Sequence, residues 1–296
     1  MAYMPNLEVL LSGIVGAKCF ALFDLTSGYW QFPLDPSCRE FFSYMTDRGI
    51  FTPMRVPQGA KGSVAYVQSS MCHILGEELL YKNAVPWIDD VLVWAGTDQE
   101  LIEAVRKLFE RCKSFGLKLH AGKSQMYTRS AIWCGKVVNE EGVTHDPERI
   151  DKLESISLPT TGADLQQFIC VVGWLQMTLL SFAEMIVPLL TFMEKVYKQA
   201  KGRTKKRVKG VRLKDLDWGV EQDRSWENVK QMLRRSVILA HPDPEKTVNV
   251  FTDASESLWG AIVTQIPKED EGKPVEKQRH QLPVSYTHLT LPTTSR

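Results

Sequence analysis

The first half of the chain alternates apolar runs with short segments that are rich in glycine and aspartate. Residues 19–25 form an apolar run that carries one carboxylate, Asp24, near its end, which is typical of a buried strand. Residues 85–88 and 91–95 are two further apolar runs, separated only by the two aspartates at 89–90. This pattern predicts a tight hairpin of two buried strands with two carboxylates at its tip.

Helical spacing of apolar residues marks three segments of the same half. We expect a short helix at residues 5–11 and a longer one at residues 63–81, after a glycine-rich loop. Thr97 and Glu100 fit a capping box that begins a third helix, and Gly116 is placed to end it. These helices would cover the predicted strands.

Shorter apolar segments predict additional strands around these elements. Residues 41–44 and 51–56 flank Asp47-Arg48-Gly49, which favours a hairpin turn. Residues 117–120 and 131–138 each predict one further strand. The first half therefore combines antiparallel strands with helices.

The second half favours helices. A break at residues 159–164 precedes an amphipathic helix that contains Leu165 and Leu175. A further helix is expected to end before Pro188, because proline lacks the amide hydrogen that a helix interior uses. Apolar residues at helical spacing predict another helix at 226–233.

Two features of the second half depart from this helical pattern. Residues 198–214 have no apolar period, which predicts a linker. Residues 248–253 predict a strand that ends on a carboxylate, and residues 260–265 predict its partner strand. The end of the chain is therefore expected to return to α/β structure.

The composition is that of a folded protein with an uneven distribution of charge. The 296 residues are 44% hydrophobic and 24% charged, which excludes a mostly disordered chain. The 36 basic and 35 acidic residues nearly cancel, yet nine of the bases lie in residues 198–214, which contain no acid. The remaining chain is therefore acidic, which excludes a uniformly basic coat protein but permits nucleic-acid contact at one segment.

The sequence gives no sign of secretion or membrane insertion. A transmembrane helix needs about 20 apolar residues, and polar and acidic side chains interrupt the best candidate at residues 171–190. The N-terminal apolar stretch follows Glu8 rather than basic residues, unlike a signal peptide. The six cysteines lack the spacing of a metal site. We expect an intracellular protein, cytoplasmic, nuclear or both, without a membrane partner.

Three carboxylates are the best candidates for chemistry. Asp24 lies at the end of one predicted buried strand, and Asp89 and Asp90 lie between two others. Buried carboxylates are costly unless something compensates them, and divalent metal ions commonly do so. An Asp-Asp pair is also frequent in ordinary turns. The apolar residues on both sides of this pair favour the functional interpretation, because they place the acids on core strands.

At these positions the sequence resembles reverse transcriptases of Ty3/gypsy-type long-terminal-repeat retrotransposons. The resemblance spans about residues 4 to 284 and consists of seven motifs in the family's order. These are residues 23–31, 56–63, 87–90, 116–124, 132–135, 146–168 and 252–265. Each motif is short, but their common order makes the resemblance specific.

The resemblance implies a role for each residue of the polymerase site. Asp24 and Asp89 would bind two Mg²⁺ ions, or Mn²⁺ in their place, with Asp90 beside them. Tyr29 would lie under the sugar of the incoming nucleotide as a steric gate against a 2′-hydroxyl, and Gln58 and Gly59 would contact that nucleotide.

The primer end would be positioned by a further segment, the primer grip, at Trp133, Cys134 and Gly135. Structural alternatives stay open for several of these residues. Tyr29 and Trp133 would serve equally as core aromatics, and Gln58 as a loop amide bonded to its own backbone.

The sequence departs from the family pattern in four places. The chain begins 23 residues before Asp24, where the family has a long fingers segment, and Trp87 stands where the family usually has tyrosine. Asp253 is the single match to the ribonuclease H metal site, so we expect no ribonuclease H activity. Residues 285–296 do not resemble the family and are expected to be non-native or disordered.

These features together predict an α+β protein with five segments. We expect a reverse-transcriptase palm with partial fingers at 1–145, a thumb at 146–197, a basic linker and connection at 198–247, and a truncated ribonuclease-H-like α/β unit at 248–284, before the tail. The basic run would either lie along the backbone of a template–primer duplex or form a solvated linker.

The predicted function is RNA-directed DNA polymerisation from an RNA or DNA template with a primer and deoxynucleotide triphosphates. Because the fingers are short, we expect weak or no polymerisation by this polypeptide alone. Two alternatives remain: a catalytically inactive nucleic-acid-binding remnant of a retrotransposon, and a Mg²⁺ nuclease that uses Asp253. The oligomeric state is not predicted.

Overall fold

The computed structural model describes residues 4–179, 182–254, 258–282 and 291–292, and the side chains of all but 253–254, 258–260 and 291–292 among them. The described chain divides into two compact units. Unit 1 comprises the residues up to Val143 together with 240–245, and unit 2 comprises residues 144–239 and most of the residues after 245. Each unit is considered by itself.

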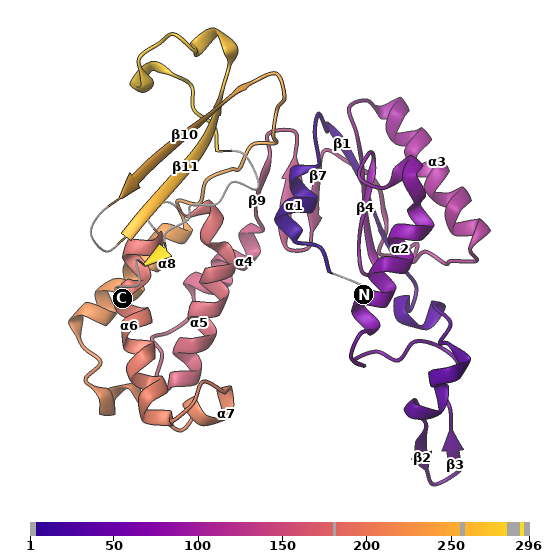
Figure 1. Ribbon diagram of the computed structural model, residues 1–296, viewed down its shortest axis with the longest axis horizontal. Coiled ribbons are helices and arrows are strands. Elements are labelled where there is room, and N and C mark those ends of the chain that lie inside the picture. Colours follow the sequence, from indigo (N-terminus) through magenta and orange to yellow (C-terminus); the bar gives the residue numbers. More distant parts are fainter. Residues whose placement is uncertain (1–3, 180–181, 255–257, 283–290, 293–296) are drawn as a thin grey trace. The chain divides into compact units, whose positions relative to one another are not determined.

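Unit 1 is built on a four-stranded antiparallel sheet with the order β4-β5-β1-β6. The strands are β1 (Cys19–Asp24), β4 (Ala84–Trp87), β5 (Asp90–Ala95) and β6 (Gln125–Thr128). Cys19, Ala21 and Phe23 alternate along β1 into an apolar core shared with two helices. These helices, α2 (Ser63–Leu79) and α3 (Asp98–Ser114), pack beside the sheet in Figure 1. The predicted buried strands and hairpin are confirmed.

The helices of unit 1 follow the predicted spacing and caps. The short N-terminal helix α1 (Leu7–Ser12) and the long α2 are both present. Thr97 and Glu100 form the predicted capping box of α3 through reciprocal side-chain and backbone hydrogen bonds. Gly116 follows the helix with a φ of 68°, the left-handed conformation that ends many helices.

Smaller strands complete unit 1. A separate hairpin consists of β2 (Tyr44–Thr46) and β3 (Gly49–Phe51), which confirms the predicted turn. The strands lie nearer the turn than predicted, since residues 41–42 belong to the 3₁₀ helix Pro36–Phe42 and β3 ends at Phe51. A three-stranded sheet has the order β7-β8-β9, with β7 (Ser130–Trp133), β8 (Lys136–Asn139) and β9 (Val143–His145). Of β9, only Val143 belongs to unit 1.

Two strand predictions in this region were wrong. Residues 131–138 form a hairpin rather than one strand, because Cys134 and Gly135 have φ values of 51° and 73°. Two successive left-handed residues produce the tight turn of a two-residue hairpin. The turn was missed because the apolar residues on both sides of it resemble one continuous strand in the sequence. Residues 117–120 form only an isolated bridge, Leu119 to Leu25, and β6 was not predicted.

Unit 2 contains a cluster of helices around an apolar core. Its helices are α4 (Pro147–Glu154), α5 (Gly162–Leu175), α6 (Phe182–Ala200), α7 (Lys205–Val208) and α8 (Val220–Leu233). Phe168 on α5 and Trp226 on α8 stack in this core with ring centroids 3.7 Å apart. The predicted helices around Leu165–Leu175 and at residues 226–233 are confirmed.

Two predictions for unit 2 were wrong. Helix α6 continues through Pro188, because its buried stripe, which includes Leu189 and Phe192, contributes more than one lost hydrogen bond costs. The basic run is not a solvated linker, because it contains α7 and buries Val208 and Leu213.

The last described segment is a β-sheet of order β10-β11-β12. Strand β10 (Thr247–Ala254) pairs antiparallel with β11 (Leu258–Ile266) along its whole length, as predicted. Of the tail expected to be non-native, the structure describes only the backbone of β12 (Leu291–Pro292).

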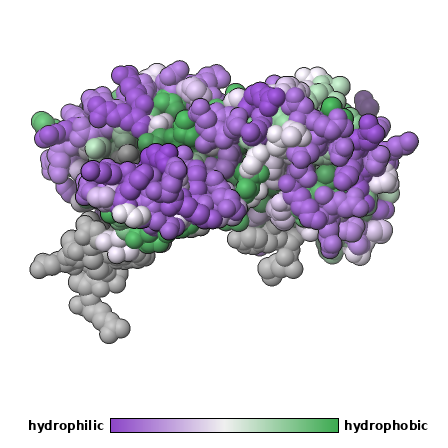
Figure 2. All heavy atoms as spheres, turned by 90° about the horizontal axis from the view of Figure 1, so that it is seen from above, coloured by the Kyte–Doolittle hydropathy of each residue, from purple (hydrophilic) through white to green (hydrophobic). Residues whose placement is uncertain are grey.

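The surface matches the composition. Figure 2 shows a face that is mostly hydrophilic, with hydrophobic residues in separate patches between the polar ones. Within the described residues, none of the helices combines the length and the apolar character that a bilayer crossing requires.

Candidate active site

Asp24 and Asp90 face each other across two neighbouring strands. They are directly paired residues of β1 and β5, and directly opposed residues of an antiparallel pair lie on the same face of the sheet. Because Phe23 points into the core beneath the helices, the next residue, Asp24, lies on the opposite face. The sheet therefore presents both acids together at one end of β1. We call Asp24, Asp89 and Asp90 the carboxylate site.

Asp89 reaches the same end of the sheet through a tight turn. Trp87 pairs with Asp90, so only Ile88 and Asp89 form the loop between β4 and β5. The Asp89 carbonyl accepts a hydrogen bond from the Leu25 amide at 2.9 Å. This bond ties the turn to the end of β1, which is separated from it by more than sixty residues of sequence.

The turn contains an unusual backbone conformation. Ile88 has a φ of 59°, which is rare for a β-branched residue and costs about 1–2 kcal/mol. Glycine is the common choice at such a position of a two-residue hairpin. Such backbone conformations cluster at functional sites, where surrounding contacts hold them.

Gln68 on α2 supplies those surrounding contacts. Its side chain is 1% exposed, donates to the Pro86 carbonyl at 2.9 Å and accepts from the Ile88 amide at 2.7 Å. One amide group therefore holds the last residues of β4 and the strained residue of the turn. Sequence reasoning missed Gln68, although a polar residue on the apolar stripe of α2, beside Met71 and Leu75, was a usable signal.

Gly28 packs directly against Asp89. A Cβ at this position would lie 2.6 Å from the Asp89 Cβ, closer than two carbon atoms approach without displacement. Gly28 begins the 3₁₀ helix Gly28–Gln31, which comes after β1 and a short turn. The absence of a side chain at Gly28 therefore lets the two aspartate-bearing segments come together. This contact was also missed by sequence reasoning.

The remaining side of the carboxylate site is formed by residues 118–123. The His120 amide donates to the Asp24 carbonyl at 2.8 Å, and Lys123 Nζ lies 3.4 Å from Asp24 Oδ2. Gln31 accepts from the Lys118 amide at 2.6 Å and donates to the Thr26 carbonyl at 2.6 Å. These bonds hold a cationic side chain beside one of the three acids.

Burial and charge repulsion act together on Asp90. Burial, together with the smaller effects of the charges of Asp89 and Asp24, raises the pKa of Asp90 to about 6, and Lys123 partly opposes this increase. Burial, and to a smaller extent the charge of Asp89, also raises the pKa of Tyr29. The carboxylate site is therefore an electronegative cluster that would gain from a bound cation.

The carboxylate site could hold a metal ion whose remaining ligands come from water and substrate. In the part of the chain that the structure describes, no three His, Cys, Asp or Glu side chains converge as a ready-made metal cage. Mg²⁺ is usually held by one or two carboxylates together with waters and substrate phosphates, so a complete protein cage is not required. The paired residues Asp24 and Asp90 supply two such carboxylates, and burial, followed by the charges of Asp89 and Asp24, raises the pKa of Asp90.

The other predicted nucleotide-binding residues lie in unit 1 as well. Tyr29 is half-buried and packs against the apolar core, next to Gly28. Gln58 and Gly59 lie in an exposed loop before α2, and Gly59 has a φ of 86°. Ser63, the first residue of α2, donates to the Pro57 carbonyl at 2.9 Å and so fixes the end of this loop.

The predicted primer grip forms the tip of the β7–β8 hairpin. Cys134 and Gly135 are the two turn residues, and Trp133 beside them is 2% exposed. The buried Trp133 indole nitrogen has no hydrogen-bond partner among the described residues. The side chain of Trp133 is therefore buried, which favours the structural alternative, and of the two turn residues Gly135 is buried and Cys134 is partly exposed.

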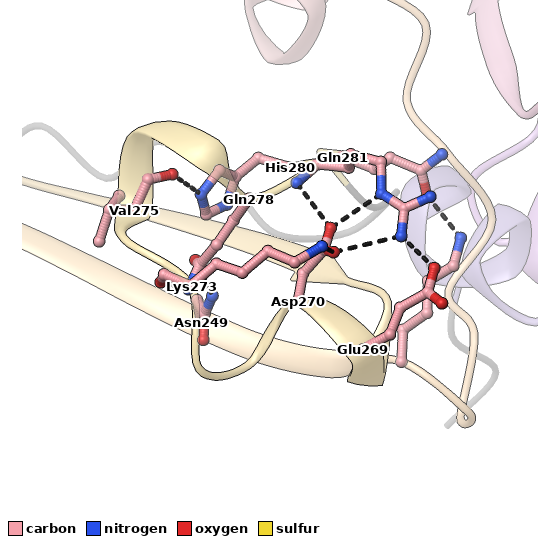
Figure 3. Close-up of polar contacts among 10 residues, drawn as sticks. Asn249, Glu269, Asp270, Lys273, Val275, Gln278, His280 and Gln281 are labelled. Atoms are coloured by element: carbon pink, nitrogen blue, oxygen red, sulfur yellow. Dashed lines mark hydrogen bonds and ion pairs between the residues drawn. The ribbon is translucent and has the colours of Figure 1, made fainter.

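Unit 2 contains a second cluster of charged side chains, which is internally compensated (Figure 3). The fully buried Asp270 carboxylate accepts from Arg279 Nε at 2.9 Å and pairs with Lys273, while Arg279 also pairs with Glu269. The hydrogen bonds from Arg279 and then Lys273 hold the pKa of Asp270 below its usual range. This cluster fixes the segment after β11. Its two acids are paired with its two bases, so we do not consider it a catalytic site.

Asp253, the predicted ribonuclease H residue, has its backbone in β10 opposite Gly260. Its side chain lies outside the described part of the chain.

Two family models match the sequence. Residues 6–161, more than half of the chain, match the family described as reverse transcriptase (RNA-dependent DNA polymerase). Residues 218–283 match the RNase H-like domain found in reverse transcriptase. The second match includes α8, which lies before the start at 248 that the sequence predicted.

Curated relatives are retrotransposon polyproteins. The chain is 24% identical over 262 residues to the retrovirus-related Pol polyprotein from transposon 297 of Drosophila melanogaster, covering 88% of this chain and 23% of that protein. It is 26% identical over 272 residues to the transposon Tf2-3 polyprotein of Schizosaccharomyces pombe, covering 92% and 19%. The chain thus spans about a fifth of the length of these relatives, and the predicted retrotransposon resemblance is confirmed.

Solved structures share the fold. The foamy viral protease-reverse transcriptase in complex with double-stranded DNA superposes with a TM-score of 0.79 at 19% identity, over 100% of this chain and 47% of that one. The same kind of protein in complex with an RNA/DNA hybrid gives 0.78 at 19% identity, over 99% and 36%. The predicted α+β architecture is confirmed by this likeness.

Proposed function

The chain belongs to the reverse transcriptase (RNA-dependent DNA polymerase) family, and from this premise we propose that unit 1 carries an RNA-directed DNA polymerase site centred on Asp24, Asp89 and Asp90. The observation that carries the proposal is the direct pairing of Asp24 with Asp90 beside the fixed turn of Asp89. This geometry gathers acids from two distant segments onto one rigid sheet end.

The proposed reaction joins a deoxynucleotide to a primer. The primer 3′-hydroxyl oxygen attacks the α-phosphorus of the triphosphate and its proton passes to water. The bond from that phosphorus to the bridging oxygen breaks, and pyrophosphate leaves with the electron pair. Asp24, Asp89 and Asp90 would hold two divalent ions, which would supply positive charge to offset the negative charge of the reacting phosphates. The protein's part is positioning and electrostatic stabilisation rather than covalent chemistry.

Different residues of this chain would bind the cations, the nucleotide and the primer end. Asp24 and Asp90 would hold the cations from paired strands, and Asp89 would hold them from the turn. Tyr29, beside Gly28 and Asp89, would lie against the nucleotide sugar, and Gln58 and Gly59 would contact the nucleotide. Cys134 and Gly135 would support the primer end, with Trp133 anchoring their hairpin.

The proposed partners are a template, a primer and deoxynucleotide triphosphates. Structural neighbours of the chain were solved with double-stranded DNA and with an RNA/DNA hybrid, which supports a double-helical substrate. The match of residues 218–283 supports the proposal that the sheet of β10 and β11 belongs to an RNase H-like unit.

Primer extension tests the proposal. Extension of oligo(dT) on poly(rA) with Mg²⁺ is expected to be weak but measurable, and Asp89→Asn should lower this rate by more than about 100-fold, because the charge that holds the cation is lost from a fixed geometry. Asp151→Asn, an exposed acid on α4, is the matched control and should leave the rate unchanged. Extension by the chain that is no greater than that of Asp89→Asn, with duplex binding retained, would support the inactive, nucleic-acid-binding alternative.

A further inference from the structure

Unit 2 has a group of exposed basic side chains within residues 198–214. Every basic residue of this segment is exposed, and the segment contains no acidic residue. We call this group the basic surface: Lys198, Lys201, Arg203, Lys205, Lys206, Arg207, Lys209, Arg212 and Lys214. It begins at the C-terminal end of α6, includes α7 and ends beyond it.

The basic surface is fixed to the helical core. Val208 and Leu213 are buried within the run. The backbone pairs with the start of α5, since the Gly162 amide donates to the Val211 carbonyl at 2.9 Å and the Leu213 amide donates to the Thr160 carbonyl at 3.1 Å. Figure 1 shows α7 beside one end of α5 and α6. The charges are therefore held in place, unlike those of a flexible tail.

Most of these charges have no acidic partner in the part of the chain that the structure describes. Within the described residues, Arg203 is the one member that forms a salt bridge, with Glu194 at 3.1 Å. Lys205 donates to the neutral Gln167 side chain, and Arg207 donates to the Lys201 carbonyl, which fixes these groups without cancelling their charge. The acid nearest in the paired segment, Asp164, is engaged by the capping threonines of α5.

The composition of the run indicates the kind of polyanion that it fits. It contains no aromatic residue, so it lacks the stacking platforms on which single-stranded nucleic acids bind. The ring of Tyr197 just before it is already covered by the Arg203 guanidinium, 5.0 Å from the ring centroid. Long basic side chains without stacking groups suit a regular array of phosphates.

We propose that the basic surface binds the sugar–phosphate backbone of double-helical nucleic acid, independently of base sequence. The identity of the polyanion rests on the proposed function, whereas the surface itself is separate from the carboxylate site and contributes no reacting group. It increases affinity for the substrate by releasing counterions from the duplex.

Salt-dependent binding of a fluorescein-labelled RNA–DNA hybrid tests this proposal. The test variant is Lys206→Gln/Lys209→Gln/Lys214→Gln, which changes three exposed residues and keeps side-chain length. The matched control is Lys82→Gln/Lys107→Gln/Lys113→Gln, which removes the same charge from exposed positions of unit 1. Fluorescence anisotropy between about 50 and 200 mM salt gives the slope of log affinity against log salt.

The test variant should bind about tenfold more weakly at low salt. Its slope should be shallower by about 0.9 for each lysine that contacts a phosphate, while the control keeps the slope of the unmodified chain. Equal losses in the two triple variants, or a larger loss for single-stranded DNA than for the hybrid, would overturn the proposal.

Primer extension distinguishes this proposal from the proposed function. Asp89→Asn should lower the extension rate by more than about 100-fold and keep the full salt slope, so failure of either proposal leaves the other measurable. Saturating hybrid should restore the extension rate of the lysine variant, because that variant changes affinity and not the reacting groups.

Discussion

The carboxylate site of unit 1 and the basic surface of unit 2 both gather like charges, but they do so by different means. The acids are placed by hydrogen bonds of individual backbone atoms: the Ile88 amide donates to the Gln68 side chain, and the Leu25 amide donates to the Asp89 carbonyl. The bases are placed by burial of neighbouring apolar residues such as Val208, while the basic residues themselves are exposed. Small displacements should therefore disable the first region, whereas the second should respond to the total charge.

A matched pair of glycine substitutions should have the largest effects, each on one of the two regions. Gly28→Ala places a Cβ 2.6 Å from the Asp89 Cβ, so we expect extension to fall by about 100-fold while hybrid affinity is retained. Gly162→Ala places a Cβ 2.8 Å from the Val208 carbonyl oxygen, so we expect weaker hybrid binding while the turn of Asp89 is untouched. Extension rates at saturating hybrid and anisotropy separate the two effects.

Gly173→Ala is the control for both substitutions. A Cβ at Gly173 would meet no atom within 4 Å, and alanine is the better helix former by roughly 0.5–1 kcal/mol. This variant should unfold at a slightly higher temperature and keep both activities. Loss of extension in Gly162→Ala at saturating hybrid, to the degree seen in Gly28→Ala, would show that the two regions are not independent.

Removing the side-chain amide of Gln68 should lower the extension rate by less, because it disturbs the turn without placing an atom against Asp89. Gln68→Met keeps the volume but deprives the Ile88 amide of its acceptor, which costs about 1–3 kcal/mol for a buried group. The turn should then relax from the left-handed conformation, and kcat should fall by roughly tenfold with little change in the Michaelis constant of the triphosphate.

A second substitution distinguishes positioning from general stability. Ile88→Gly removes the backbone strain, because glycine adopts a positive φ without steric cost, so it should recover part of the kcat lost in Gln68→Met. A lysine substitution on the basic surface should show no such recovery. If Ile88→Gly lowers kcat further in the Gln68→Met background, Gln68 does not act through the conformation of the turn.

The pH dependence of stability gives the smallest effect. The pKa of Asp90 is raised to about 6 from 3.8, so the protonated carboxyl stabilises the native state below about pH 4, and this contribution is lost as pH rises through about 6. Without divalent ions, Asp90→Asn should therefore raise the free energy of unfolding above pH 6 by on the order of 1–2 kcal/mol.

Urea unfolding in EDTA at about pH 4 and pH 8 checks this expectation. Asp90→Asn should match the unmodified chain at the lower pH, and Asp151→Asn should match it at both. An equal gain for Asp90→Asn at both pH values would show that the effect is packing rather than charge.

The sequence predicted the acids better than the groups that hold them. Asp24, Asp89 and Asp90 were selected as candidates because each interrupts or ends an apolar run, a signal that is local in the chain. Gly28 and Gln68 act on the turn across sequence gaps of about sixty and twenty residues, and no local pattern encodes those contacts.

The fold errors have the same origin. Pro188 was expected to end a helix by local propensity, but the buried stripe of α6 carries the helix through it. The basic run was expected to be a linker because it has no apolar period, yet two isolated apolar residues, Val208 and Leu213, are enough to dock it. Tertiary contacts decided both cases, and the spacing of apolar residues along the sequence does not reveal such contacts.

The most direct test of the carboxylate site is to locate a bound metal ion without relying on turnover. Fe²⁺ in place of Mg²⁺, with ascorbate, hybrid and a deoxynucleotide triphosphate, generates hydroxyl radicals that cut the backbone near the ion. We predict cuts near residues 24–28 and 87–91 that excess Mg²⁺ suppresses and Asp24→Asn removes. Cuts confined to other segments, or cuts at these positions that persist in Asp24→Asn, would contradict the assignment of these acids to one metal site.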